Sequence, residues 1–177
     1  MTRLPAALTL AVLLLSACGS TPGDVLPDPR DGRSGIRLSG TLQDRQVAFS
    51  DGLPELNFGD CDLNTGNDRD FCIITRDING ELIVIVFENP DALMQGERLA
   101  VADVDCADPP ACDQVTEAAL IDVQVGVTDR VRAVSGQVTM EVIEPLRRYR
   151  GDFDIRLPDG SALSATFDVV PRPEELS

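Results

Sequence analysis

The clearest pattern in the chain is a pair of apolar runs separated by a short polar turn. The runs cover residues 71–75 and 82–87, and the turn between them is Asp77-Ile78-Asn79-Gly80. Asn-Gly accepts positive φ at both central positions of a type I′ turn, so this segment predicts a β-hairpin. The second run is apolar at every position, which predicts a central strand covered on both faces.

A second hairpin is predicted near the C-terminus. Between residues 149 and 157, apolar positions alternate with Arg150, Asp152, Asp154 and Arg156, and residues 163–169 alternate again after the turn at 158–160. A period of two with one polar face is typical of half-buried strands. Weaker alternation predicts further strands at 36–42, 45–50, 98–104, 120–128, 130–135 and 137–143.

Signals for helices are sparse. Asn89, Pro90 and Gly96 supply an N-cap, a first-turn proline and a C-terminal glycine, enough for one or two turns. Residues 111–120 offer a second short piece. The chain therefore predicts an all-β fold, either an antiparallel β-sandwich or a flattened barrel of about eight to ten strands, with one or two very short helices.

Composition excludes several classes of function. The chain has 177 residues, which suits one domain, and its formal net charge is −15. All 15 cations are Arg, and the chain contains no His, Lys or Trp. Without His, the commonest general base and a common metal ligand are missing. The negative charge argues against nucleic acid as a partner, because phosphate contacts need clustered cations.

The N-terminal residues have the organisation of an export signal. Arg3 supplies a positive start, residues 4–15 form a mostly apolar run, and Leu15-Ser16-Ala17-Cys18 ends the segment. The run is shorter than the roughly 20 residues that a membrane-spanning helix needs. Leu-Ser-Ala-Cys resembles the lipobox of bacterial lipoproteins. The resemblance implies a signal peptide at 1–17, cleavage before Cys18, and a diacylglycerol on the Cys18 thiol.

The same resemblance implies an exported protein that is anchored to a membrane by its N-terminal lipid. Several acyl chains give stable anchoring, and Gly19, rather than Asp, after Cys18 implies the outer membrane if the cell is Gram-negative. Residues 18–35 are rich in Gly and Pro, which predicts a flexible tether. Residues 36–170 then form the β-domain, and residues 171–177 form a polar tail.

Four cysteines follow the lipobox, and they are predicted to form disulfides. An exported protein meets an oxidising compartment, so the even number predicts two bridges. Three pairings are possible, and the favoured one joins Cys61 to Cys72 and Cys106 to Cys112, which closes two polar loops. The alternative is a metal tetrad, but no close Cys-x-x-Cys pair is present.

One segment is dense in oxygen ligands. Asp60, Asp62, Asn64 and Asp68 carry side-chain oxygens, and Gly66 adds a carbonyl. Calcium takes six to eight oxygens from a flexible loop, so a calcium site is one hypothesis. The segment departs from the EF-hand pattern, because its glycine comes one position late and an aromatic residue stands at the twelfth position. The favoured alternative is an acidic, solvated loop held by a disulfide, with no cofactor.

Two further clusters have simple structural explanations. Asp152 and Asp154 share a strand face about 7 Å apart, a separation that glycosidase carboxylates also use. Their flanking arginines favour a solvated surface instead, so no catalytic residue is assigned. The cationic run Arg147-Arg148-Tyr149-Arg150 is interpreted as charge that protects a strand edge; the alternative is contact with lipid headgroups or an acidic partner.

These observations predict a non-enzymatic binding or structural domain at the cell envelope, with another envelope protein or a glycan as its partner. One alternative is a carrier of a small apolar ligand with a barrel-like core. A less favoured alternative is a hydrolase that depends on carboxylates.

Overall fold

The computed structural model describes residues 34–52, 54–58, 61, 71–104, 112, 114–128, 130–145 and 147–170. The predicted signal peptide, Cys18, nearly all of the tether and the polar tail lie outside this set. The described elements are eleven strands and one 3₁₀ turn: β1 (Gly35–Leu42), β2 (Arg45–Asp51), β3 (Glu55–Phe58), β4 (Phe71–Arg76), β5 (Leu82–Phe87), η1 (Pro90–Ala92), β6 (Arg98–Ala102), β7 (Ile121–Val125), β8 (Val131–Arg132), β9 (Ser135–Glu144), β10 (Arg148–Arg156) and β11 (Ala162–Val169). Within this part of the chain, no helix is both long and apolar enough to cross a membrane.

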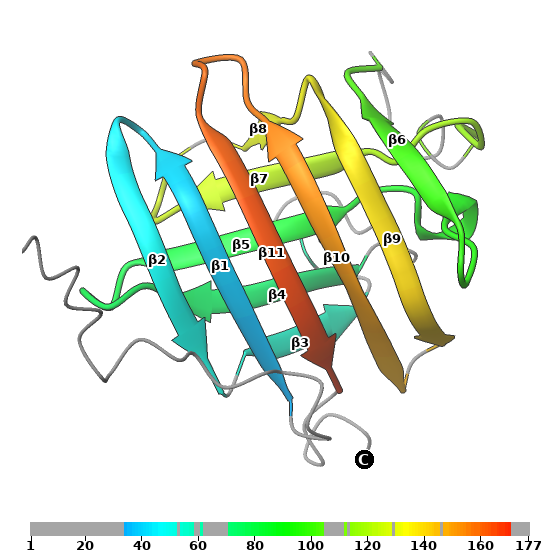
Figure 1. Ribbon diagram of the computed structural model, residues 1–177, viewed down its shortest axis with the longest axis horizontal. Coiled ribbons are helices and arrows are strands. Elements are labelled where there is room, and N and C mark those ends of the chain that lie inside the picture. The colour runs from blue at the N-terminus through cyan, green and yellow to red at the C-terminus, as the bar shows by residue number, and fades with distance from the viewer. Residues whose placement is uncertain are drawn as a thin grey trace, which may run out of the picture.

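The strands form two antiparallel sheets. One sheet has six strands in the order β2-β1-β11-β10-β9-β6, and the other has five in the order β3-β4-β5-β7-β8. The sheets stack face to face, and the strands of one cross those of the other (Figure 1). The predicted all-β sandwich is therefore confirmed, and the two sheets are separate rather than joined as a flattened barrel.

Apolar side chains from both sheets fill the space between them. Phe71 stacks on Phe87 and on Tyr149, each with ring centroids 4.3 Å apart. Phe153 and Phe167, on neighbouring strands of the six-stranded sheet, meet with their centroids 6.3 Å apart. The four phenylalanines are almost completely buried. Aromatic side chains bury large apolar areas, so this cluster is a major source of the sandwich's stability.

The hairpin predicted at 71–87 is confirmed, but its turn type is not. Arg76 pairs with Leu82, and only Gly80 in the turn has positive φ, at 81°. Asp77 explains the difference, because its carboxylate accepts hydrogen bonds from the N–H groups of Asn79 and Glu81, both at 2.8 Å. These bonds hold the chain in a type I turn followed by a left-handed glycine, rather than in a type I′ turn. As predicted, β5 is central in its sheet and buried on both faces.

Asn89 does not have its predicted role as a helix cap. η1 forms where the helix was expected, but the Asn89 side chain makes no capping hydrogen bond. Its amide instead donates to the carbonyls of Val115 and Ala118, both at 2.7 Å, and accepts from the N–H of Leu120 at 2.8 Å. Asn89 therefore fixes the chain that leads into β7. Turns and a single bridge occupy 114–120, and residues 111 and 113 of the second predicted helix lie outside the described residues.

The six weaker strand predictions are right in position, but three are slightly too short and three are too long. β7 is shorter than the predicted 120–128, and β8 contains only two residues of the predicted 130–135. β3 was not predicted, because its run of four residues is too short to stand out, although it alternates between polar and apolar. Pairing with β4 supplies the hydrogen bonds that make it a strand.

Candidate binding surface

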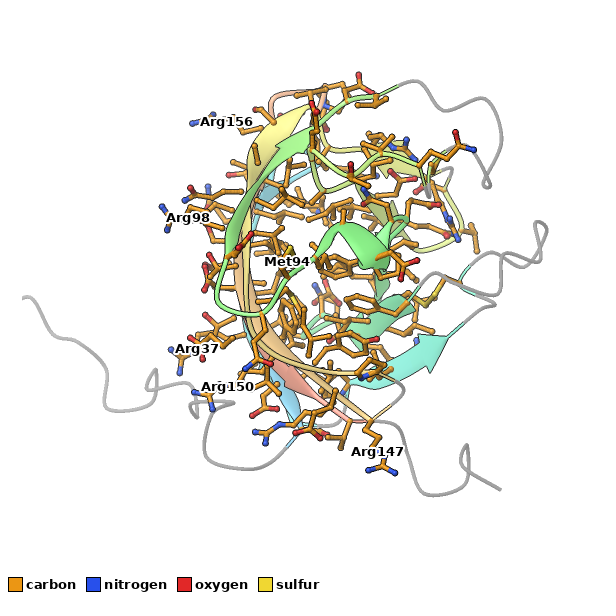
Figure 2. All side chains as sticks on the ribbon, turned by 90° about the vertical axis from the view of Figure 1, so that its right-hand side faces the viewer. Arg37, Met94, Arg98, Arg147, Arg150 and Arg156 are labelled. Atoms are coloured by element: carbon orange, nitrogen blue, oxygen red, sulfur yellow. A yellow bond between two sulfur atoms is a disulfide. The ribbon has the colours of Figure 1, made fainter. Side chains whose placement is uncertain are left out.

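The carboxylates at 152 and 154 lie on the outer face of the six-stranded sheet, which is the face turned away from the five-stranded sheet. Phe153 and Ile155 are buried between the sheets, so the alternation of β10 directs Asp152 and Asp154 outward. Figure 2 shows Arg37, Arg98, Arg150 and Arg156 projecting from this same side. The strand face predicted from the sequence is therefore present and solvated.

Register places hydrogen-bonding groups beside each of the two carboxylates. Asp154 pairs with Ser164 of β11 and with Gln137 of β9, and Asp152 pairs with Thr166 and Thr139. The Ser164 hydroxyl donates a hydrogen bond to the Asp154 carboxylate. Paired residues in an antiparallel sheet lie on the same face, so these side chains form rows across three strands.

Two shallow depressions cross this surface and meet at Asp154 and Ser164. One has a volume of about 250 Å³ and is lined by Arg37, Ser39 and Asp152 among others. The second has a volume of about 450 Å³ and continues past Arg156 toward β9. The arginine side chains that line the depressions can donate hydrogen bonds, and the neighbouring carboxylates can accept them. Both depressions are open to water. This geometry suits reversible binding of a polar ligand better than a reaction that needs a dry site.

Ion pairs fix one end of the outer face. Arg148 binds Asp168 through two hydrogen bonds, Nε to Oδ1 at 2.8 Å and Nη2 to Oδ2 at 2.6 Å. This bond raises the pKa of Arg148 above its usual value. Arg150 Nε lies 2.8 Å from Glu141 Oε2. The interpretation of this cationic run as protection of a strand edge is wrong, because β10 lies between β9 and β11.

Glycine allows close backbone approach beneath the larger depression. A Cβ at Gly136 would lie 2.1 Å from the carbonyl oxygen of Asp154, and the φ of Gly136 is 144°. Any side chain there would displace β10 and with it Asp154. Gly136 therefore lines the larger depression and helps to determine its shape.

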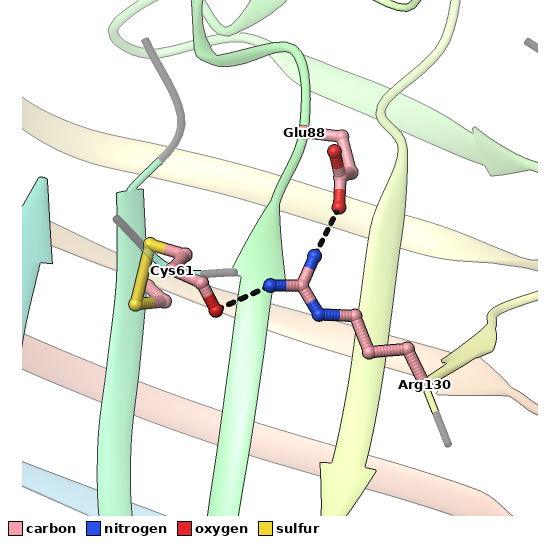
Figure 3. Close-up of a disulfide and its surroundings, with 4 residues drawn as sticks. Cys61, Glu88 and Arg130 are labelled. Carbon is pink, nitrogen blue, oxygen red and sulfur yellow. Dashed lines mark hydrogen bonds and ion pairs between the residues drawn. A yellow bond between two sulfur atoms is a disulfide. The ribbon is translucent and has the colours of Figure 1, made fainter. Parts of the chain in front are cut away.

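The local pairing of Cys61 with Cys72 is confirmed. Arg130 holds the same region, because its guanidinium donates to the carbonyl oxygen of Cys61 and pairs with Glu88 Oε1 at 2.9 Å (Figure 3). The Glu88 carboxylate is only 7% exposed. A buried ion pair with an added hydrogen bond ties the disulfide to β5 and to the start of β8.

The second bridge is only partly visible. Cys112 is buried and disulfide-bonded, whereas Cys106 lies outside the described residues, so its predicted link to Cys112 stays a prediction.

The calcium hypothesis also stays a prediction. Asp60, Asp62, Asn64, Gly66 and Asp68 all lie outside the described residues. Among the residues that the structure does describe, no group of three or more Cys, Asp or Glu side chains is placed to hold a metal ion.

Arg132 and Asp122 form an ion pair between β7 and β8 of the five-stranded sheet. Arg132 contacts Asp122 through Nε at 2.7 Å and Nη2 at 3.1 Å, and also donates to the carbonyl of Val104. Burial acts to lower the pKa of Arg132, but the hydrogen bond and charge of Asp122 outweigh it and raise that pKa. Because these groups satisfy one another, the cluster is structural.

Comparison with known proteins gives no assignment for this surface. No family model, curated protein or solved structure matches the chain. The outer face therefore has to be interpreted from its own geometry. The sequence identified Asp152 and Asp154 as candidates but not Arg37, Ser39 and Ser164. The alternation of β1 and β11 was visible in the sequence, but the pairing that places these residues beside β10 was not.

Proposed function

We propose that the chain is an exported lipoprotein, anchored through Cys18, whose β-sandwich is a non-enzymatic binding domain of the cell envelope. Its binding surface is the outer face of the six-stranded sheet. The observation that carries this proposal is the set of hydroxyl, carboxylate and guanidinium groups around the depressions that meet at Asp154 and Ser164. The anchor rests on the lipobox at Leu15-Ser16-Ala17-Cys18.

An envelope glycan is the partner that suits this surface best. Sugar hydroxyls both donate and accept hydrogen bonds. The larger depression offers both kinds of partner, because the Asp154 carboxylate accepts and the Arg156 guanidinium donates. Protein interfaces are enriched in aromatic residues and Met at their centres. In the described part of the chain, the exposed large hydrophobic residues all lie outside the six strands of this sheet: Ile78, Met94, Val127, Val131, Val134 and Val170.

The packed interior supports a binding domain over a carrier of an apolar ligand. A carrier needs an apolar cavity of several hundred Å³. Here the rings of Phe71, Phe87 and Tyr149 stack in the space between the sheets. Aliphatic side chains such as Leu38, with no exposed surface, pack around them.

Glycan binding is tested by co-sedimentation of the purified protein with insoluble cell-wall glycan from the producing cells. Asp154→Ala and Arg156→Ala are each expected to weaken binding about tenfold, because each removes a charged hydrogen-bonding group from the depression. Arg76→Ala is the matched control, since Arg76 is exposed on β4 of the other sheet. Equal binding by all three variants, or no binding by the wild type, contradicts the proposal.

The lipid anchor is tested separately by intact mass. Protein extracted from membranes is expected to have the mass of residues 18–177 plus acyl groups, and Cys18→Ser is expected to be released or left unprocessed. A soluble, unacylated wild-type protein would reject the anchor without affecting the glycan test.

A further inference from the structure

Among the residues that the structure describes, no strand pairs with the outer side of β2, and soluble proteins normally protect such an edge. An edge strand presents unpaired N–H and C=O groups that can pair with another strand, so edges are shortened, charged, bulged or covered. β2 has seven residues, and its central five, Gln46–Ser50, contain no charge, proline or glycine. Its register with β1 is continuous, with no bulge.

The other edges of the two sheets are short or covered. β3 has four residues and β8 has two. β6 is covered by the chain before β7, because Ala119 donates to the carbonyl of Ala100 at 2.8 Å and accepts from the N–H of Ala102 at 3.2 Å. Among the described strands, β2 is therefore the long edge without such cover (Figure 1).

The hairpin geometry determines which groups of β2 point outward. Gln43 and Asp44, both with positive φ, form a two-residue turn that pairs Leu42 with Arg45. The closing pair of such a turn exchanges hydrogen bonds, and every second residue then faces β1. The backbone groups of Gln46, Ala48 and Ser50 consequently point to the open side.

The sequence of β2 is complementary to itself when read in the opposite direction. An antiparallel pairing centred on Ala48 places Arg45 opposite Asp51 of the second copy, and Gln46 opposite Ser50. The same register places Val47 opposite Phe49, which joins apolar positions. Within one copy Arg45 already pairs with Glu81, and Asp51 accepts a hydrogen bond from Thr75 at 2.8 Å. The matched apolar positions and the small residue at the two-fold axis therefore favour this register more than the end charges do.

We propose that two copies of the chain pair edge to edge through β2, antiparallel about Ala48, to form one continuous sheet. Gln46 with Ser50, and Ala48 with Ala48, become hydrogen-bonded pairs across the interface. The net charge of −15 opposes association, but the central residues of β2 are uncharged, and charges more than about 8 Å away are screened at physiological salt. The dimer brings two outer faces side by side, so a long polymer can be bound at both.

Disulfide cross-linking of variants with one added cysteine, in the chain that keeps its own disulfides, tests the proposed register. Ala48→Cys brings two Cα atoms to about 5.5 Å, within the roughly 4.4–6.8 Å that a disulfide spans. Mild oxidation of membranes that contain this variant is expected to convert most of the protein to a species of twice the mass on a non-reducing gel. Gln46→Cys is the matched control, because its two copies lie about 14 Å apart.

Each result of this experiment supports or overturns the proposal. When the Gln46→Cys and Ser50→Cys variants are mixed, a disulfide between the two cysteines, absent from either variant alone, supports the antiparallel register. Ala48→Cys dimers no more abundant than those of Gln46→Cys overturn it, as does cross-linking of Gln46→Cys to itself, which indicates a parallel pairing. A cross-linked band whose mass spectrum contains a different protein shows another occupant and also overturns it.

Sedimentation equilibrium provides a second, independent measurement. The full-length protein, in detergent matched to the solvent density, is expected to sediment as a dimer at high concentration. Ala48→Glu places like charges across the axis and is expected to give a monomer. Ala100→Glu, at an exposed position on β6, is the control and is expected to remain dimeric. A wild-type monomer at every concentration overturns the proposal.

Discussion

At the scale of single residues, a few buried polar side chains hold backbone segments of this fold in place through their hydrogen bonds. Asn89 is 2% exposed and satisfies three backbone groups of the chain before β7. Asn89→Asp keeps the shape and one acceptor but loses both donors, so the carbonyls of Val115 and Ala118 lose their partner. We expect the free energy of unfolding to fall by about 1–3 kcal/mol in urea titrations. Asn79→Ala, which removes one exposed hydrogen bond to Asp77, is expected to have a smaller effect, below about 1 kcal/mol. Equal effects of the two substitutions would contradict the role given to Asn89.

Arg130 and Glu88 form the second informative contact at this scale. Arg130→Ala removes the cation that hydrogen-bonds to the buried Glu88 carboxylate, which is expected to lower the free energy of unfolding by about 3 kcal/mol. Arg130→Ala with Glu88→Gln also removes the buried negative charge and is expected to recover part of this loss. The measurement is the midpoint of chemical unfolding. A double variant no more stable than Arg130→Ala would argue against the buried charge as the cause.

At the scale of elements, the turn between β4 and β5 predicts a dependence of stability on pH. Burial acts to raise the pKa of Asp77, but hydrogen bonds from the N–H of Glu81 and from Asn79 outweigh it and lower the pKa. A carboxyl with a lowered pKa stabilises the folded state above its unfolded pKa, about 3.9, and loses this effect as the pH falls through the folded value. The stability difference between wild type and Asp77→Asn should therefore be constant near neutral pH and decrease below about pH 4. A difference independent of pH between 7 and 3 would contradict this assignment.

The strand pair β9–β10 supplies another prediction at this scale. Gly136→Ala combines an unfavourable φ with a clash against the backbone of Asp154, so we expect the free energy of unfolding to fall by about 2 kcal/mol or more. Gly52→Ala is the matched control, since no atom lies within 4 Å of its Cβ position and its φ is ordinary. Thermal unfolding followed by circular dichroism measures both. A control as unstable as Gly136→Ala would remove the steric explanation.

At the scale of the whole molecule, the excess of carboxylates dominates. A net charge of −15 destabilises the compact state through repulsion, so the thermal midpoint is expected to rise when NaCl is increased from 20 to about 200 mM, because salt screens these charges. CaCl₂ at the same ionic strength separates screening from specific binding. A larger rise with calcium, abolished by Asp62→Asn, would support the calcium hypothesis. A fall in the midpoint with NaCl would show that the favourable ion pairs outweigh the repulsion.

The sequence determined the local features, because these depend on neighbouring residues. Alternation along 149–157 predicted which side chains of β10 are buried, and the all-apolar run of β5 predicted a central strand. The spacing of Cys61 and Cys72 predicted a local disulfide. In each case the physical cause, a side-chain period or a short loop, lies within a few residues of the chain.

Only the tertiary structure decided which strands are neighbours, since pairing joins residues far apart in the sequence. Register placed Ser164 beside Asp154, separated Arg148 and Arg150 from any edge of the described sheet, and put β2 at its edge. The residues next to Asn89 in the sequence predicted that it caps a helix. In the folded chain its side chain hydrogen-bonds to the backbone before β7 instead, which the neighbouring residues could not show. A binding face and an edge are properties of several strands at once, so their residues acquire meaning only when the sheets are assembled.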